Sequence, residues 1–375
     1  MRLMEKLQTP AYFYDGKVIN TKCRELKKNF PGVKLYYACK ANDNKEIIKL
    51  IARQGFGVET VSPGEISLAR RAGVPYSRMT FTCGSINERE LTAVIKKGIR
   101  VHLDSLHQVE IIGKNFPNSE ISIRLNQGIG AGHHSHVITG GPDSKFGIDI
   151  SHIPKLKGLV KKYNLKITGL HQHIGSNVPD AFTLVLAMKT LFKTALSFPD
   201  LKHLDFGGGL GVAYHPSDKK LNIKDFAKSA HKLKKVFIKK YGRNIEMSFE
   251  PGRYLVAEAG TLLVKVTDIK ENPKKTFVGV NSGFNHLIRP ALYGSYHEII
   301  NLNNRKGKKE KLTIVGNICE SGDFFAKDRL MVKPKIGDTL AIKNAGAYGY
   351  VMSSDYNSRP KPKEYLKIGD KIKRV

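Results

Sequence analysis

The sequence predicts an α/β fold, a (β/α)8 barrel, followed by a domain made mostly of β-strands. Two observations lead to this prediction. From about residue 33 to residue 255, short apolar strand-like runs alternate with helical patterns, and the alternation repeats eight times. After about residue 260, strand-like runs follow one another and are separated by turns rich in Gly, Pro, Asn and Lys. A length of 375 residues suits a large barrel plus one smaller domain.

The barrel strands are expected where apolar and aromatic residues form short uninterrupted runs. These runs are Lys34–Ala38, Gly57–Val61, Met79–Thr82, Arg100–Leu103, Glu120–Leu125, Lys166–His171, His203–Phe206 and Ile245–Phe249. Helices are expected in the gaps between them. The clearest helical patterns are Lys45–Arg53, Gly64–Ala72, Glu88–Lys97, Ser105–Asn115 and Ile223–Tyr241.

The second domain is predicted because strand-like runs replace the alternation of strands and helices after about residue 260. Its strand-like runs are Thr261–Lys270, Thr276–Asn281, Lys311–Val315, Thr339–Asn344 and Glu364–Ile368. The segment Ala11–Ile19 is also strand-like, and we expect it to pair into this domain although it precedes the first barrel helix. The expected domains are therefore a barrel over residues 27–260 and a β domain over residues 261–375 with residues 1–26.

The formal net charge of +30 has two interpretations. One is nucleic-acid binding, in which clustered Lys and Arg neutralise phosphates. The other is a solvated surface rich in lysine. The basic residues are spread along the chain without interleaved aromatic residues, and no nucleic-acid motif is found. The sequence therefore favours the second interpretation and no nucleic-acid partner, although a positive field would speed the capture of an anionic substrate.

Two features bear on location. The first ten residues have no apolar core of a signal peptide, and no apolar run is long enough to span a bilayer. The cysteines show no CxxC spacing, which favours a reducing compartment and argues against a structural zinc site. They are Cys23, Cys39, Cys83 and Cys319. We expect a cytoplasmic protein without a membrane partner.

Four motifs stand where predicted barrel strands end, which is where a βα barrel places its functional groups. Lys40 lies in Leu-Tyr-Tyr-Ala-Cys-Lys-Ala-Asn, and the others are His171–Ser176, Asp205–Gly211 and Phe249–Arg253. Each alone has a simpler explanation, such as a lysine that caps a strand or a glycine turn. Their occurrence at four strand ends favours one common site.

The residue types in these motifs match the parts of a pyridoxal phosphate (PLP) site. Consecutive glycines let backbone N–H groups approach a phosphate. A lysine forms a Schiff base with an aldehyde cofactor. A carboxylate can keep a pyridine nitrogen protonated, which makes the ring an electron sink. An imidazole can stack on the ring.

Taken together, the motifs resemble those of the alanine-racemase-like, fold-type III PLP-dependent decarboxylases, over nearly the whole chain. The motifs Val-Ser-Pro-Gly-Glu (61–65), Ser-Lys-Phe-Gly-Ile (144–148) and Glu-Pro-Gly-Arg (250–253) are shared by family members that act on ornithine, arginine or diaminopimelate. Three motifs of the β domain, at 288–297, at 319–323 and at 345–350 with 356–360, are similar to the diaminopimelate branch. The resemblance implies a PLP-binding TIM barrel and a C-terminal β-sandwich or β-barrel domain.

The resemblance also implies roles for individual residues. Lys40 should form the Schiff base with PLP, His173 should stack on the ring, and Glu250 should bind the pyridine nitrogen. The phosphate should be surrounded by Ser176, Gly208, Gly209, Gly252 and Tyr348. Arg253 is expected near the cofactor as well. The distal end of the substrate should be held by Arg253, Arg289, Tyr293, Glu320 and Tyr348.

Cys319 and Glu320 resemble a pair that the partner subunit of a homodimer inserts into the active site. Cys319 would then be the acid that returns a proton to the α-carbon after CO2 leaves. The alternative for Cys319 is an ordinary buried cysteine of the β domain. A homodimer with shared active sites is therefore expected.

The reaction implied is decarboxylation of meso-2,6-diaminopimelate to L-lysine and CO2, the last step of lysine biosynthesis. Alternatives are a related decarboxylase acting on ornithine, lysine or carboxynorspermidine, and an inactive regulator that kept the fold. Arg253, Arg289 and Tyr293 argue against plain diamine precursors, because these would leave buried arginine charges unpaired. An inactive regulator is disfavoured because the chain retains Lys40, His173, Glu250 and Cys319.

Two local departures are notable. Glu59 stands where many relatives carry Asp, and the longer carboxylate changes how it reaches Lys40. His133, His134 and His136 lie close together in a loop, but no neighbouring Cys or carboxylate completes a metal site. No metal is predicted.

Overall fold

The structure, a computed structural model, describes residues 4–130, 141 and 143–375. The chain divides into two compact units. The barrel unit comprises residues 22–211 and 219–252, and the β unit comprises residues 1–21, 212–218 and 253–375. The short segment Val212–Asp218, which the sequence placed inside the barrel domain, groups with the β unit. The domain boundaries at 26/27 and 260/261 stay a prediction.

Within the described residues, eight parallel strands close into a barrel, because β5 pairs with β6 and β10 pairs with β2. Strand β7 (Ile148–Asp149) pairs with β6 outside this ring. The predicted (β/α)8 barrel is confirmed. Its strands are β2 (Lys34–Ala38), β3 (Gly57–Thr60), β4 (Met79–Phe81), β5 (Arg100–Leu103), β6 (Glu120–Asn126), β8 (Lys166–His171), β9 (His203–Asp205) and β10 (Glu246–Phe249).

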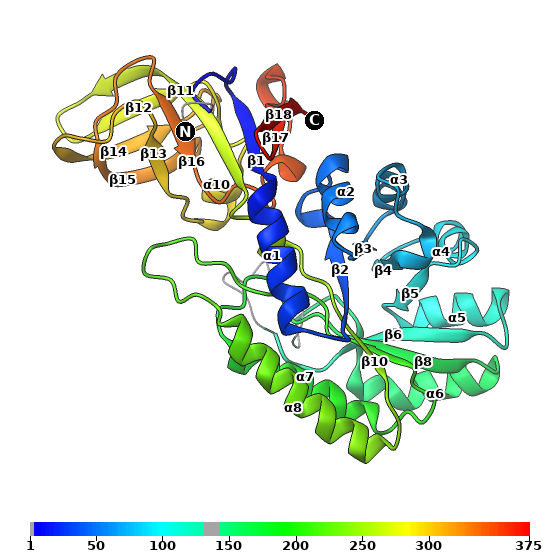
Figure 1. The fold of residues 1–375 in the computed structure, drawn as a ribbon. Helices are drawn as coiled ribbons and strands as arrows, with labels where there is room; N and C mark the ends of the chain where they lie inside the picture. Colours follow the sequence, from blue (N-terminus) through cyan, green and yellow to red (C-terminus); the bar gives the residue numbers. More distant parts are fainter. Residues whose placement is uncertain (1–3, 131–140, 142) are drawn as a thin grey trace. The chain divides into compact units, whose positions relative to one another are not determined.

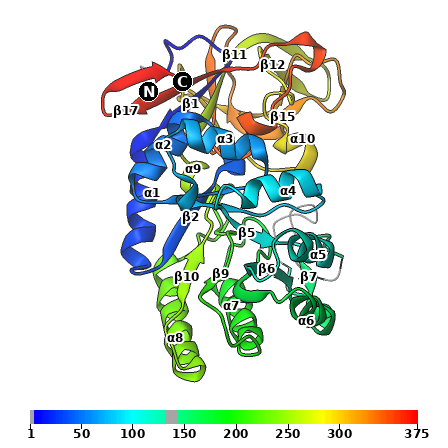
Figure 2. The ribbon, with the colours of Figure 1, turned by 90° about the vertical axis from the view of Figure 1, so that its right-hand side faces the viewer.

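Helices cover the outside of the barrel and follow it in chain order from α2 to α8 (Figure 2). The two long helices α7 and α8 lie side by side (Figure 1). These helices are α2 (Lys45–Arg53), α3 (Pro63–Arg71), α4 (Glu88–Ile95), α5 (Leu106–Asn115), α6 (Ile153–Lys162), α7 (Ala181–Ala195) and α8 (Ile223–Tyr241). Within the part of the chain that the structure describes, no helix has both the length and the apolar character needed to cross a bilayer.

Capping side chains determine where several of these helices begin. The hydroxyl of Ser62 accepts a hydrogen bond from the backbone N–H of Glu65 at 3.2 Å, at the start of α3. Asp180 accepts from the N–H of Thr183 at 2.8 Å, at the start of α7. Each cap satisfies a free N–H of the first turn and contributes about 1 kcal/mol.

An aromatic cluster anchors the last barrel strand. The ring of Phe249, at the end of β10, lies 5.1 Å from that of Phe30 and 5.6 Å from that of Phe226 of α8, between centroids. All three side chains are buried. This packing holds β10 directly before Glu250, which is the next residue of the chain.

The β unit contains one sheet in the order β15–β14–β12–β11–β1–β17–β18, and β16 pairs with both β11 and β13. Its short helices are α9 (Arg253–Val256) and α10 (Arg289–Tyr293). The strands are β1 (Ala11–Asp15), β11 (Gly260–Glu271), β12 (Thr276–Val280), β13 (Ile299–Asn301), β14 (Lys309–Val315), β15 (Phe324–Val332), β16 (Thr339–Ile342), β17 (Lys363–Ile368) and β18 (Lys371–Arg374).

The N-terminal segment joins this sheet, as predicted, because β1 pairs with β11 and with β17. The prediction of a strand through Ile19 is wrong in its second half. Strand β1 ends at Asp15, and helix α1 (Gly16–Asn29) follows at once. The Asp15 carboxylate accepts a hydrogen bond from the N–H of Lys17 at 2.9 Å, which is a helix-start pattern.

Candidate active site

Lys40 stands directly after β2, in the short 3-10 helix Cys39–Ala41. Its Nζ lies 2.5 Å from Oε2 of Glu59, which comes from the neighbouring strand β3. The side chain of Lys40 is 34% exposed, whereas that of Glu59 is 1% exposed. A buried carboxylate therefore holds a lysine that remains partly open to solvent.

Glu250 follows β10 and is buried. Its Oε1 accepts a hydrogen bond from the Thr80 hydroxyl at 3.3 Å, and its Oε2 lies 3.1 Å from Nε2 of His171. Burial raises the pKa of Glu250 to about 8, and the negative charge of Glu59 acts in the same direction. Such a perturbed carboxyl at a barrel strand end is typical of a functional site.

His173 follows β8 and lies against the glycine-rich turn after β9. Its Nδ1 accepts a hydrogen bond from the backbone N–H of Gly208 at 3.2 Å. Desolvation, with Lys40 and Arg124 nearby, holds the pKa of His173 well below its usual value, so the ring is neutral. Gly209 has φ +101°, and a Cβ there would lie 2.8 Å from the carbonyl oxygen of Gly175. This turn can therefore close only with glycine.

Ser176 and Gly252 belong to the same end of the barrel. Ser176 lies in the loop that follows His173. At Gly252, a Cβ would lie 2.9 Å from the carbonyl oxygen of Ala38, the last residue of β2. The loop after β10 thus packs tightly against the strand end that carries Lys40.

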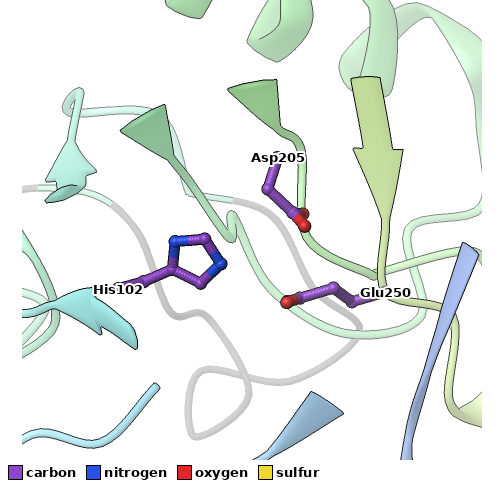
Figure 3. A group of neighbouring side chains, drawn as sticks. All are labelled: His102, Asp205 and Glu250. Atoms are coloured by element: carbon purple, nitrogen blue, oxygen red, sulfur yellow. The ribbon is translucent and has the colours of Figure 1, made fainter. Parts of the chain in front are cut away.

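His102, Asp205 and Glu250 point toward one another inside the barrel (Figure 3), with ligand atoms within 4.8 Å. Such a group could hold a metal ion, but both carboxylates already accept hydrogen bonds from the protein, and only Nε2 of His102 has no partner within the described residues. Asp205 accepts hydrogen bonds from the Ser248 hydroxyl and the Gly207 N–H, at 2.5 and 2.8 Å. Nδ1 of His102 lies 2.7 Å from the Ser122 hydroxyl.

We therefore assign this group to the buried polar interior of the barrel, where hydrogen bonds hold its side chains. The histidines of the predicted loop, His133, His134 and His136, lie outside the described residues.

A second cluster lies in the β unit and is built around Arg253. This residue begins α9 and is buried. Its Nη1 donates a hydrogen bond to the hydroxyl of Tyr214 at 2.9 Å. Its guanidinium carbon lies 4.7 Å from the ring centroid of Tyr348, which is held at φ +55°, a conformation that bulky residues rarely adopt. Tyr293 ends α10 and belongs to the same electrostatic cluster.

Arg289 is 1% exposed and has only neutral partners within the described residues. Its Nη1 donates to Nε2 of His297 at 3.0 Å, and its Nη2 donates to the Ser295 hydroxyl at 3.3 Å. Nδ1 of His297 lies 2.8 Å from the carbonyl oxygen of Lys343, so Nδ1 carries the proton and Nε2 accepts. The Nε of Arg289 has no hydrogen-bond partner in the described part of the chain.

Tyr214 contacts both arginines. Its ring centroid lies 4.5 Å from the guanidinium carbon of Arg289. Burial alone would raise the pKa of Tyr214, but the charges of Arg253 and Arg289 lower it below its usual value. The cluster therefore presents excess positive charge in a buried setting, which suits an anionic ligand.

Cys319 and Glu320 lie in an exposed loop of the β unit. The backbone N–H of Cys319 donates to Oδ1 of Asn357 at 2.8 Å, and the Tyr356 hydroxyl donates to Oε1 of Glu320 at 2.8 Å. The alternative of a buried Cys319 is wrong for this chain. The loop is shaped by Asp323, which accepts the N–H of Ile318 at 2.7 Å.

The predicted residues thus fall into two groups. The barrel brings together Lys40, His173, Ser176, Gly208, Gly209, Glu250 and Gly252. The β unit contains Arg253, Arg289, Tyr293, Cys319, Glu320 and Tyr348. Four side chains that complete these groups had no predicted role, namely Thr80, His171, Tyr214 and His297. The sequence points to His171 and His297 only because they lie inside the motifs His171–Ser176 and 288–297.

A parallel barrel whose strand ends carry a lysine, a buried carboxylate, an imidazole and a glycine turn defines the PLP-dependent class of barrel enzymes. Residues 17–257 match the family described as pyridoxal-dependent decarboxylase, pyridoxal binding domain. The chain is 40% identical to diaminopimelate decarboxylase from Methanothermobacter thermautotrophicus, covering 98% of this chain and 88% of that protein. It is 37% identical to the Aquifex aeolicus enzyme of that name, covering 100% and 90%.

The structure agrees with these matches. It superposes on Helicobacter pylori diaminopimelate decarboxylase complexed with L-lysine with a TM-score of 0.90, at 33% identity, covering 100% of this chain and 95% of that one. The chain belongs to the diaminopimelate decarboxylase family.

The barrel residues fit PLP, the predicted cofactor, on their own chemistry. Lys40 offers an amine that is partly open to solvent, and Glu250 offers a buried carboxyl group. The turn at Gly209 has no room for a side chain, so its backbone can approach a phosphate closely. The match to a pyridoxal-binding family confirms the cofactor.

Proposed function

We propose that the chain decarboxylates meso-2,6-diaminopimelate to L-lysine and CO2, the last step of lysine biosynthesis. The observation that carries the proposal is the buried guanidinium of Arg289, which has no carboxylate partner within the described residues. A buried cation without a counter-ion is costly, so the missing ligand should be an anion. Diaminopimelate has a second carboxylate, whereas ornithine and lysine end in an ammonium. The names of the 40% and 37% identical relatives support the same substrate.

When bound, PLP supplies the sink for the electron pair left behind as the α-carboxylate departs as CO2. Lys40 would hold the cofactor through Nζ between turnovers, and Glu59 would keep that nitrogen in place. Glu250 would hold the proton on the pyridine nitrogen. His173 would lie against the ring, where a neutral imidazole adds no repelling charge.

The remaining residues would bind and orient. The phosphate would be held by the N–H groups and hydroxyls of Ser176, Gly208, Gly209, Gly252 and Tyr348. Arg253 and Tyr348 would serve both cofactor and substrate. The distal ammonium-carboxylate end would be bound by Arg253, Arg289, Tyr293 and Glu320. Arginine suits this task because its planar fork holds a carboxylate in a bidentate manner.

The chain would act as a homodimer with shared active sites. The exposed positions of Cys319 and Glu320 support this part of the proposal, because both side chains are available to another subunit. Cys319 would supply the proton that replaces CO2 on the α-carbon. The unpaired thiols support a cytoplasmic location.

The test is a decarboxylation assay on the purified, PLP-loaded protein. We would compare meso-diaminopimelate with L-lysine, L-ornithine and carboxynorspermidine, and follow both CO2 and product. Strong preference for meso-diaminopimelate is expected. Preference for another substrate would overturn the role of Arg289. No turnover at all, with a cofactor absorbance that still depends on Lys40, would favour the inactive regulator.

Arg289→Lys is the matched variant for this assay. It keeps the positive charge but loses the planar fork, so its KM for diaminopimelate should rise by about tenfold or more. Its cofactor absorbance should stay unchanged. Loss of the absorbance as well would mean that the substitution disturbs more than the distal end.

A further inference from the structure

His171 contacts the carboxylate that the proposed function assigns to the pyridine nitrogen. It is the last residue of β8 and is 1% exposed. Its Nε2 lies 3.1 Å from Oε2 of Glu250. The opposite oxygen of Glu250 receives the Thr80 hydroxyl at 3.3 Å. His171 and Thr80 therefore hold the two carboxylate oxygens from two different strands.

The ring of His171 is held in a fixed plane. The ring of His102 stacks on it, with centroids 4.5 Å apart and planes inclined by 21°. His102 is itself tied to the Ser122 hydroxyl through Nδ1, at 2.7 Å. A stacked and buried ring cannot rotate freely, so Nε2 stays directed at Glu250.

His171 carries a single ring proton. Burial holds its pKa well below the usual value, and the positive charges of Arg124 and Lys40 act in the same direction. The proton can sit on Nε2 or on Nδ1. Within the described residues, Nδ1 has no hydrogen-bond partner.

The two positions of that proton have different costs. With the proton on Nε2, the ring donates to Oε2 of Glu250, and Nδ1 is only an unused acceptor. With the proton on Nδ1, Glu250 must be protonated to donate to Nε2, and a buried N–H is left without an acceptor. Orphaned buried donors are rarer than orphaned acceptors, so the first arrangement is favoured.

We propose that His171 is a positioning residue that, in the holoenzyme, holds Glu250 as a carboxylate by donating its only ring proton from Nε2 to Oε2. The inference rests on the proposed function, which gives Glu250 the pyridine nitrogen. It adds that His171, which has no proposed contact with the cofactor, controls the charge of Glu250, which does. Burial alone would favour the neutral acid, which is a weaker acceptor for the pyridinium N–H and brings no negative charge to stabilise it.

The test uses the holoenzyme loaded with PLP labelled with 15N at the pyridine nitrogen. The 15N chemical shift reports directly whether this nitrogen is protonated. We expect a protonated nitrogen in the wild-type enzyme and a largely unprotonated one in His171→Phe, which keeps a stacked ring but has no donor. His171→Gln, whose amide can donate, should restore protonation.

His203→Phe is the matched control. It makes the same exchange inside the same barrel, but Nε2 of His203 lies 3.2 Å from the Ser122 hydroxyl and so serves a different partner. Its pyridine nitrogen should stay protonated. If His171→Phe does not fold, the 15N shifts of His171→Gln and His171→Asn are compared instead. The shorter Asn amide cannot reach Oε2, so only His171→Gln should keep the nitrogen protonated.

The outcomes separate the two claims. An unprotonated nitrogen in the wild-type enzyme would overturn the proposed role of Glu250. If the nitrogen is protonated in the wild-type enzyme and equally protonated in His171→Phe or in His171→Asn, the role of His171 alone is overturned.

Steady-state kinetics give a further readout. The kcat should fall by about tenfold or more in His171→Phe, with a much smaller change in KM.

The pH dependence of kcat is the second readout. The charged or titratable groups that influence His171 are Glu250, Arg124, Lys40, His102 and His203. In His171→Phe the acidic limb of the profile should move to higher pH, because Glu250 ionises less readily without its donor. An unmoved profile would count against the proposal.

Discussion

The ring of Tyr214 covers the guanidinium of Arg289, with 4.5 Å between the ring centroid and the guanidinium carbon. The Tyr214 hydroxyl also accepts a hydrogen bond from Arg253 at 2.9 Å. Tyr214→Phe should keep the ring contact and lose the hydrogen bond. Because a hydrogen bond to a charged group is worth about 1.5–3 kcal/mol, we expect KM for diaminopimelate to rise by about tenfold or more. Steady-state kinetics would show this with kcat changed little.

Tyr296→Phe serves as the control for that substitution. The Tyr296 ring contacts a different arginine, Arg329, whose guanidinium carbon lies 3.9 Å from the ring centroid. Its variant should leave KM within about twofold of the wild-type value. Equal effects of the two substitutions would contradict a specific role for the Tyr214 hydroxyl.

Two buried arginines should differ in how much stability the protein loses when their charge is removed. Arg124 is paired with Asp104 at 3.1 Å, and both side chains are buried. Arg124→Met leaves the Asp104 charge without its partner, which should cost about 3–5 kcal/mol. Arg289→Met removes a charge that has only neutral partners. We expect its free energy of unfolding to change by less than about 2 kcal/mol.

Thermal unfolding of the protein without substrate checks this contrast. Arg124→Met should show a clear fall in Tm and Arg289→Met a small change of either sign. The same Arg289→Met protein should not turn over diaminopimelate. A large loss of stability in Arg289→Met would mean that the arginine serves the fold rather than a ligand.

The sequence was most informative where a local pattern determines the structure. Strand β2 has the predicted bounds, Lys34–Ala38, because an apolar run at the centre of a parallel barrel has no other stable setting. Lys40 could be placed at its end for the same reason. The segment after Asp15 is helical although its pattern predicts a strand, because its apolar residues suit either element and the Asp15 carboxylate caps the helix.

The partners across the barrel could not be predicted. His171 and Glu250 are separated by 79 positions in the chain, and Thr80 and Glu250 by 170. No local pattern records which side chains meet at such separations. Tyr214 was missed for a related reason, since an aromatic residue after a glycine-rich turn is more often a core residue.

Stability of the cofactor-free protein should depend on pH through Glu250. Burial raises its pKa from an ordinary 4.5 to about 8, so the folded state binds this proton more tightly than the unfolded chain. The resulting stabilisation is fully present below about pH 4.5 and is lost as the pH rises through about 8. Glu250→Gln has no such proton to lose.

Urea unfolding of wild-type protein and Glu250→Gln at several pH values measures this effect. The variant should gain stability relative to wild type by a few kcal/mol between about pH 5 and pH 9. Glu65, whose pKa burial raises to about 7, titrates in both proteins and so largely cancels in the difference. Parallel stability curves would show that Glu250 is already ionised in the folded, cofactor-free state.

The proposed dimer makes a prediction about mixed subunits. If Cys319 serves the site of the partner subunit, a heterodimer of Lys40→Ala and Cys319→Ala chains contains one site with neither change. Random mixing of equal amounts should then restore about a quarter of wild-type activity, since half of the dimers are mixed and each has one intact site. Lys40→Ala mixed with Glu250→Gln is the control, because both changes lie in the barrel and no intact site forms. Verified heterodimers without recovery in the first mixture, when Cys319→Ala alone is inactive, would place Cys319 at the site of its own subunit.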